Sequence, residues 1–126
     1  MTQPGDIIEK LQIKAQNIFE STDILKVIGV DSMVTKFFNQ DVKLDFVVQV
    51  ETKKRENYYI CFIIKTSGQP RFARETAYQL QFICNNQKNI YGVFGAPYIS
   101  DEAKSICQEL GVGYLDLAGN CFFKFN

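Results

Sequence analysis

Seven consecutive apolar residues, Tyr58 to Ile64, constrain this chain more than any other stretch of its sequence. Uninterrupted apolar runs of this length, bounded by turn signals, are typical of a strand buried on both faces of a sheet. The run ends at Lys65, whose ammonium group is very costly to bury without a partner. Lys65 therefore either reaches solvent or lies in a cleft that receives an anion.

A basic segment follows this predicted strand. Between Lys65 and Arg74 there is no acidic residue, so the segment carries a charge of +3 in a chain whose formal net charge is zero. Arg71 and Arg74 are two of only three arginines in the sequence. The balanced total charge argues against a non-specific polyanion binder, so any contact with nucleic acid must come from a local patch. The segment from Lys65 to Arg74 is the best candidate for that patch.

The composition excludes several kinds of chemistry. The chain has no histidine, which removes histidine-based triads, histidine-ligated zinc and imidazole acid–base catalysis. The cysteines are widely spaced and form no CxxC pair, so a zinc ribbon or a dithiol motif is not expected. Each of them has apolar neighbours, which predicts buried free thiols in a reducing compartment. The four are Cys61, Cys84, Cys107 and Cys121.

Hydrophobic spacing and turn signals predict the other elements. Ser21–Asp31 is interpreted as a short helix or a turn that ends at Gly29, and Met33–Phe38 as a strand or the end of a helix. The remaining predicted helices are Asp6 to about Glu20, Phe72 to Asn85, and a helix that Ser100 caps and Gly111 ends. The remaining predicted strands are Lys43–Glu51, Asn89–Gly95, Val112–Leu117 and Cys121–Phe125.

These elements predict a mixed sheet with helices on both faces. The charged residues of 52–57 form the turn of a hairpin between Lys43–Glu51 and Tyr58–Lys65. The unit Asn89–Leu117 is a short strand–helix–strand crossover, so its two strands should be parallel and the crossover right-handed. The fold class is therefore α/β.

Two polar groupings carry possible chemistry. Alternation places Asp45 on the face of its strand that could meet Lys65, where the two form either an exposed ion pair or part of a site for Mg²⁺ and a phosphoryl group. Glu75 and Gln79 share a helical face with Arg71. That row is either a solvated surface or a polar row directed into the same cleft. The sequence leaves both alternatives open in each case.

Three motifs in order resemble bacterial domains of the PD-(D/E)XK nuclease superfamily, which have the restriction-endonuclease-like fold. The motifs are KTSGQPR at 65–71, APYIS at 96–100 and GYLDLAGN at 113–120. The resemblance covers about Leu44 to Phe125. It implies a mixed β-sheet flanked by helices in the order α-β-β-β-α-β-α-β, which makes Met33–Phe38 a strand.

The resemblance also assigns roles to residues. Asp45 matches the first acid of the superfamily, Ile63-Ile64-Lys65 occupies its E-x-K motif, and Gln79 matches a helix glutamine that faces the site. The chain departs from the pattern at the second acid, which is Ile63. Isoleucine has no oxygen with which to bind a metal or hold a water.

The departure favours a nuclease-like DNA-binding domain with a degenerate metal site. Its expected phosphate contacts come from Lys65, Ser67, Gln69, Arg71 and Arg74. One alternative is an active Mg²⁺-dependent DNA endonuclease whose second acid has migrated to Glu75. Its catalytic residues would then be Asp45, Lys65, Glu75 and Gln79, with Asp45 and Glu75 as metal ligands. The other alternative is a regulatory domain that binds protein partners.

Residues 1–126 are expected to form a single nuclease-like domain, either alone or as part of a longer protein. The resemblance is compatible with a homodimer and with an additional domain such as a winged helix. The polar start of the chain does not resemble a signal peptide, and no apolar run has the length of a membrane span. The expected location is therefore the cytoplasm, with DNA rather than a membrane as the partner.

Overall fold

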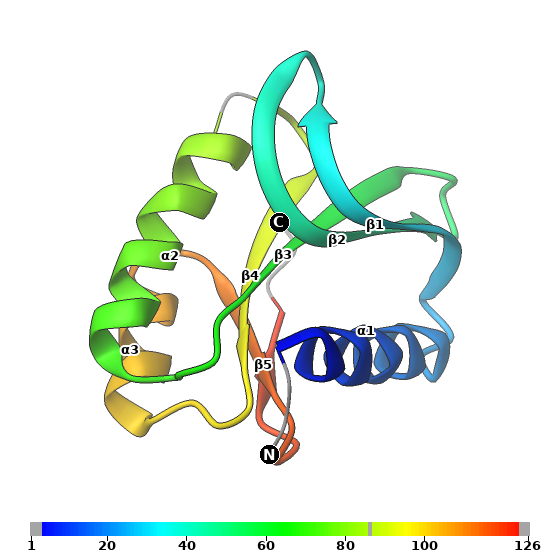
Figure 1. Ribbon diagram of the computed structural model, residues 1–126. Helices are drawn as coiled ribbons and strands as arrows, with labels where there is room; N and C mark the ends of the chain where they lie inside the picture. The colour runs from blue at the N-terminus through cyan, green and yellow to red at the C-terminus, as the bar shows by residue number, and fades with distance from the viewer. Residues whose placement is uncertain (1–3, 86, 124–126) are drawn as a thin grey trace.

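The computed structural model describes residues 4–85 and 87–123, which form a six-stranded mixed sheet flanked by three helices (Figure 1). Strands β1–β2, β2–β3 and β5–β6 pair antiparallel, whereas β3, β4 and β5 run parallel. This arrangement confirms the predicted fold class. The elements are α1 (Pro4–Glu20), β1 (Leu25–Phe37), β2 (Gln40–Thr52), β3 (Asn57–Ile64), α2 (Pro70–Cys84), β4 (Ile90–Ala96), α3 (Asp101–Glu109), β5 (Gly113–Asp116) and β6 (Cys121–Phe122).

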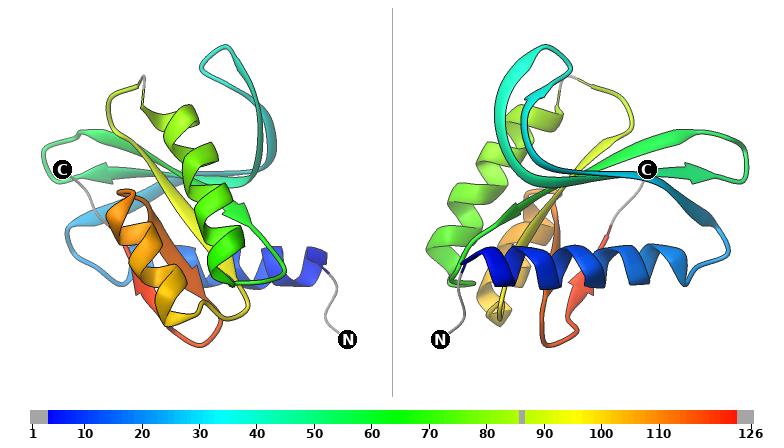
Figure 2. Two further views of the ribbon diagram at one scale, coloured as in Figure 1. Left: turned by 90° about the vertical axis from the view of Figure 1, so that its left-hand side faces the viewer. Right: turned by 45° about the vertical axis from the view of Figure 1, so that its right-hand side comes forward.

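Strand β3 lies inside the sheet and is covered on both faces. Ile60 and Phe62 belong to the core beneath α1, where the Phe62 ring stacks on Phe46 with centroids 4.3 Å apart. Cys61 and Ile63 belong to the core on the other face, which α2 and α3 cover (Figure 2). The apolar run Tyr58–Ile64 is therefore a strand with both faces covered, as predicted. No helix in the described part of the chain is long and apolar enough to cross a membrane.

The first hairpin corrects one prediction. The interpretation of Ser21–Asp31 as a short helix or a turn is wrong from Leu25 onward, because β1 begins there and pairs along β2, whereas the residues before Leu25 do form a turn. Gly29 lies at an irregularity in that pairing rather than at a helix end. The hairpin turns at Phe38 and Asn39, which both have positive φ (49° and 66°), as a two-residue turn between strands requires. The Met33–Phe38 region is strand through Phe37, as the resemblance implies.

The other elements agree closely with their predictions. The Ser100 side chain accepts a hydrogen bond from Ala103 N–H (3.2 Å) and begins α3, while Gly111 follows that helix with φ +73°. The predicted strand Cys121–Phe125 includes residues that lie outside the described part of the chain. The prediction that every cysteine is buried is wrong for Cys121, which is exposed, and holds only in part for Cys84, which is half-buried.

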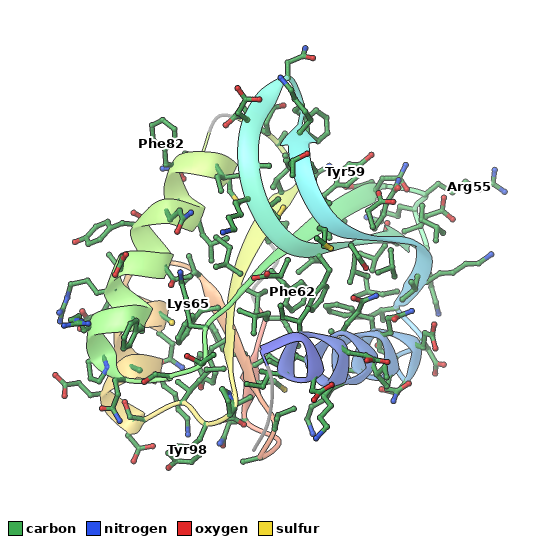
Figure 3. The ribbon with its side chains drawn as sticks, in the orientation of Figure 1. Arg55, Tyr59, Phe62, Lys65, Phe82 and Tyr98 are labelled. Atoms are coloured by element: carbon green, nitrogen blue, oxygen red, sulfur yellow. The ribbon has the colours of Figure 1, made fainter. Side chains whose placement is uncertain are left out.

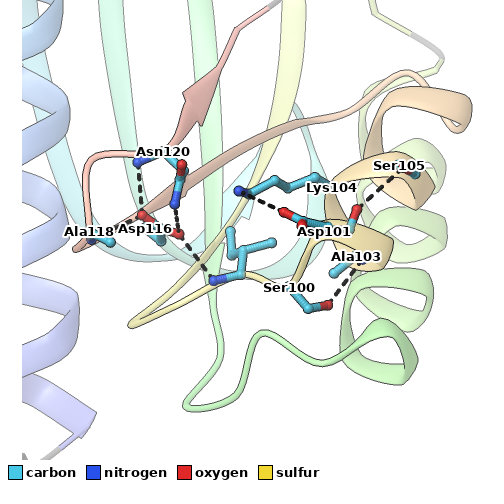
Figure 4. Close-up of polar contacts among 9 residues, drawn as sticks. Ser100, Asp101, Ala103, Lys104, Ser105, Asp116, Ala118 and Asn120 are labelled. Atoms are coloured by element: carbon cyan, nitrogen blue, oxygen red, sulfur yellow. Dashed lines mark hydrogen bonds and ion pairs between the residues drawn. The ribbon is translucent and has the colours of Figure 1, made fainter.

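A buried carboxylate joins the turn after β5 to the connection after β4. Asp116 is fully buried and accepts four hydrogen bonds (Figure 4). The backbone N–H groups of Ala118 and Asn120 donate to Oδ1 at 3.0 and 2.9 Å. Ile99 N–H and the Asn120 side-chain amide donate to Oδ2 at 3.1 and 2.9 Å. Because charge-assisted hydrogen bonds are strong, this carboxylate fixes two loops with one side chain.

We predict that Asp116→Asn lowers the free energy of unfolding by about 3 kcal/mol. One amide oxygen can replace only one carboxylate oxygen, so two donors lose their acceptor and face an NH₂ group. Denaturant titration measures the change. The matched control is Asp41→Asn, which removes a carboxylate from the exposed pair with Lys36 and should change stability by less than about 1 kcal/mol. Equal effects of the two substitutions would contradict the role of Asp116.

Candidate nucleic-acid interface

The candidate interface begins where the chain leaves β3 at Lys65 (Figure 3). Lys65 N–H donates to the Gly95 carbonyl of β4 at 2.8 Å. Three residues on, Gly68 forms a parallel bridge with Ile99, and its carbonyl accepts from Ser100 N–H at 3.1 Å. A side chain at Gly68 would collide with the backbone of Tyr98 and Ile99, so glycine is required for this close approach. The loop that carries the basic segment is therefore attached to the β4–α3 connection.

The same hydrogen-bond network brings the three sequence motifs together. Asp116 holds Ile99 N–H, and the bridge between Ile99 and Gly68 holds the loop after β3. Each motif follows or ends one of three adjacent parallel strands. Since the carboxyl ends of parallel strands lie at one edge of a sheet, segments far apart in sequence form one surface there.

Asp45 lies where β2 and β3 separate. The paired register of the two strands ends at Phe46 opposite Phe62. One residue further, Asp45 Oδ2 accepts a hydrogen bond from Ile64 N–H at 2.6 Å. The Asp45 side chain, rather than a backbone carbonyl of β2, thus accepts this hydrogen bond from β3. Ile63, next to Ile64, is buried with 4% exposure and contributes only an aliphatic side chain.

Burial dominates the electrostatics of Asp45. Desolvation raises the pKa of its carboxyl above the ordinary value, although the hydrogen bond from Ile64 and the charges of Lys65 and Lys43 act in the opposite direction. The ion pairs in the described part of the chain are Lys36–Asp41 and Lys104–Asp101, so Asp45 and Lys65 do not form the exposed pair that was one alternative. Lys43 was not considered as a site residue, although its position two residues before Asp45 on one strand was a usable signal.

The candidate phosphate-binding side chains line the loop after β3 and the start of α2. Arg71 and Arg74 are exposed, and the Arg71 guanidinium lies 5.0 Å from the centroid of the Phe72 ring. The Ser67 hydroxyl accepts from Gln69 N–H at 3.4 Å. Gln69 is the N-cap residue of α2, but its side chain makes no capping hydrogen bond. Both arginines and the Gln69 amide are thus presented on an open surface.

Helix α2 presents Glu75 and Gln79 to solvent. Both are exposed, while the residues that α2 buries lie on another side of the helix. That buried stripe is Ala73, Thr76, Ala77, Leu80 and Ile83. Glu75 lies one turn after Arg71 on the outward side. The described residues contain no group of three or more cysteine or carboxylate side chains able to hold a metal ion.

These donors do not fit a divalent cation. Mg²⁺ requires near-octahedral oxygen ligands and usually takes one or two protein carboxylates together with substrate phosphates. Asp45 already uses one oxygen for Ile64 N–H, the Ile63 side chain has no atom that can bind a metal, and Glu75 lies on the outer surface of α2. No catalytic step through a metal follows from this arrangement.

The β1–β2 hairpin adds a feature that the sequence analysis missed. A hollow of about 220 Å³ lies between the two strands and β3, with Val47 and Gln49 in its lining. Three aromatic rings line it in edge-to-face contact, with centroids 4.7 to 5.8 Å apart. They are Phe37, Phe38 and Tyr59. No sequence signal locates the hollow. Its shape depends on the curvature of the β1–β2 hairpin, and β1 was not predicted in full.

Comparison with known proteins relates this chain to nucleases by fold. No family model and no curated protein matches the sequence. A repair endonuclease from Pyrococcus abyssi superposes with a TM-score of 0.58 at 13% identity, over 93% of this chain and 48% of its own. Two structures of EndoMS each give a TM-score of 0.48. The apo form is 13% identical over 85% of this chain and 45% of its own, and the complex with dsDNA is 14% identical over 82% and 42%. The chain thus spans about half the length of the structures it matches, and it shares a nuclease-like fold with the Pyrococcus protein.

Proposed function

We propose that this chain is a DNA-binding domain of the PD-(D/E)XK type with a degenerate metal site. The observation that carries the proposal is the buried aliphatic side chain of Ile63, next to Ile64, whose N–H binds Asp45; the resemblance assigns position 63 to the acid of the E-x-K motif. A nuclease-like fold whose second carboxylate is replaced by isoleucine retains a surface for DNA but lacks the oxygens that cleavage requires. We further propose that residues 1–126 are the nuclease-like part of a longer protein.

The arrangement of the basic segment supports DNA as the partner. Lys65, Arg71 and Arg74 lie within ten residues without an intervening carboxylate. Lys65 begins a loop that two backbone attachments hold in place, and the two arginines lie in the first turns of α2, which follows that loop. Phosphate contacts of this kind supply affinity without reading sequence. The similarity in fold to a repair endonuclease from Pyrococcus abyssi supports the same partner. The domain therefore binds the phosphate backbone.

We predict that Arg71→Ala and Arg74→Ala each weaken DNA binding equally on unrelated sequences. Each substitution removes one phosphate contact. The plot of log affinity against log salt should therefore become less steep, by about 0.9 for each arginine removed. Fluorescence anisotropy with labelled duplexes over a salt series measures both quantities. The matched control is Arg55→Ala, which removes the third arginine, far from Lys65 in the β2–β3 turn (Figure 3).

Two results would contradict this prediction. One is a sequence preference that survives both substitutions, because it would place recognition elsewhere. The other is a loss with Arg55→Ala equal to the loss with Arg71→Ala, since the affinity would then reflect only total charge.

A second prediction concerns the stability contribution of Asp45. Burial raises the pKa of Asp45 above its ordinary value of 3.8. Between that value and the raised pKa the folded chain binds more protons than the unfolded chain, so the free energy of unfolding falls as the pH rises through this range. Asp45→Asn keeps an oxygen for Ile64 N–H and removes the charge. We expect this variant to melt at a higher temperature than wild type at pH 7, with the difference vanishing as the pH falls below 3.8.

Thermal unfolding monitored by circular dichroism at a series of pH values measures the difference, with Asp41→Asn as the exposed control. A lower melting temperature for Asp45→Asn at pH 7 would show that the carboxylate stabilises the fold instead. The environment of Asp45 would then favour the charged form of its carboxyl.

A further inference from the structure

Two large aromatic side chains lie on the outer surface of α2, where the helix of a globular protein is normally polar. Tyr78 is 56% exposed and Phe82 is 77% exposed. They are four residues apart, so they are neighbours on one side of the helix, about 6 Å apart along its axis. Phe82 points away from the sheet near the end of α2 (Figure 3). Packing of the core therefore does not account for either ring.

The same side of α2 continues into the proposed phosphate contacts. Arg74 lies four residues before Tyr78, so Arg74, Tyr78 and Phe82 form one row along the helix, here called the outer row. Arg71, in the first turn of α2, is exposed as well. Glu75 is the one carboxylate of α2, and the two arginines leave the helix with a net positive charge.

A row of this composition suits an unpaired strand of nucleic acid. Proteins that bind single strands combine cations for the phosphates with aromatic rings on which the bases stack. In a duplex the faces of each base are covered by the neighbouring base pairs, whereas an unpaired base offers a face to an aromatic ring. The outer row supplies one cation and two rings within about 12 Å of helix. It therefore provides a contact that separates a single strand from a duplex, which the arginines alone do not.

We propose that the outer row binds a single-stranded segment of DNA, with a phosphate at Arg74 and bases stacked on Tyr78 and Phe82. The inference rests on the proposed DNA-binding function, because Arg74 takes part in both contacts, and it names the form of DNA that this surface prefers. Exposed aromatic rings also suit a protein partner. The row is continuous with the acid-free segment from Lys65 to Arg74, however, and this continuity favours a polyanion.

Fluorescence anisotropy of the full chain with a labelled oligothymidine, and with a duplex of the same length, tests the proposal. Phe82→Ala and Tyr78→Ala should each weaken binding of the single strand about tenfold, because each removes one stacking contact. Both should leave binding of the duplex unchanged. Circular dichroism checks that the variants fold, which the exposure of both rings leads us to expect.

Three further variants separate stacking from a general loss of apolar surface. Phe82→Tyr keeps an aromatic ring and should keep the affinity for oligothymidine. Phe82→Leu keeps an apolar side chain without a ring and should bind as weakly as Phe82→Ala. Met33→Ala removes a side chain that is 83% exposed on β1, and it should change the affinity for neither form of DNA.

Tryptophan, which the chain lacks, gives a second and direct readout. Phe82→Trp places one indole in the outer row, and stacking of a base on that indole should quench its emission. Oligothymidine should therefore quench the emission of Phe82→Trp, and the duplex should not. Met33→Trp is the matched control, because its indole lies on β1 and should be quenched by neither.

The results distinguish failure of this inference from failure of the proposed function. If Arg71→Ala and Arg74→Ala change the binding of neither form of DNA, the proposed function and the inference both fail. If they weaken duplex binding while the aromatic variants leave single-strand binding unchanged, only the inference is wrong. It is also wrong if Phe82→Leu binds oligothymidine like wild type. A dimer in sedimentation experiments that Phe82→Ala dissociates would overturn it too, because the outer row would then join two copies of the chain.

Discussion

The parallel pairing of β3, β4 and β5 is the constraint on which the rest of the structure depends. It brings the ends of three strands to one edge of the sheet, where the loops that follow them must share space. The buried Asp116 carboxylate then connects two of these loops, and the Gly68–Ile99 bridge connects the third. The basic segment therefore begins on a loop that is fixed to the sheet edge and continues into the first turns of α2. Lys65 lies at its start because the apolar run of β3 ends there.

The residues at this edge of the sheet offer cations to a phosphate backbone but few carboxylates to a metal ion. Arg71 and Arg74 are exposed and Lys65 is half-buried, whereas the Asp45 carboxylate accepts from Ile64 N–H where β2 and β3 separate. Burial of that carboxylate costs stability unless something offsets its charge, and the neighbouring position contributes isoleucine. In our proposal this edge corresponds to a nuclease site without its full set of oxygens. We therefore regard binding of the DNA backbone as the function that this surface can support.

Much of the fold could be predicted from hydrophobic patterns, because β3 and the helix after it have strong local signals. The strand β1 could not, since its residues around Gly29 and Met33 have weak periodicity and acquire strand geometry only by pairing with β2. The candidate site residues were chosen from spacing and from the family resemblance, but their geometry could not be predicted. The hydrogen bond from Ile64 N–H to Asp45 and the outward position of Glu75 depend on where strands separate and how α2 sits on the sheet, and neither is a local property. The exposure of Cys121 likewise depends on the shortness of β6.

Cleavage of supercoiled plasmid with Mg²⁺ or Mn²⁺ distinguishes a DNA-binding domain from an active nuclease. We expect wild-type protein to bind the plasmid but to leave it intact with either ion. Ile63→Glu, with its folding checked by circular dichroism, is the variant that restores the missing acid, and Lys65→Ala and Glu75→Gln are the controls. Metal-dependent cleavage by the wild-type protein that both Asp45→Asn and Glu75→Gln abolish, with binding intact, would contradict the account. It would show that Glu75 supplies the second acid of an active nuclease.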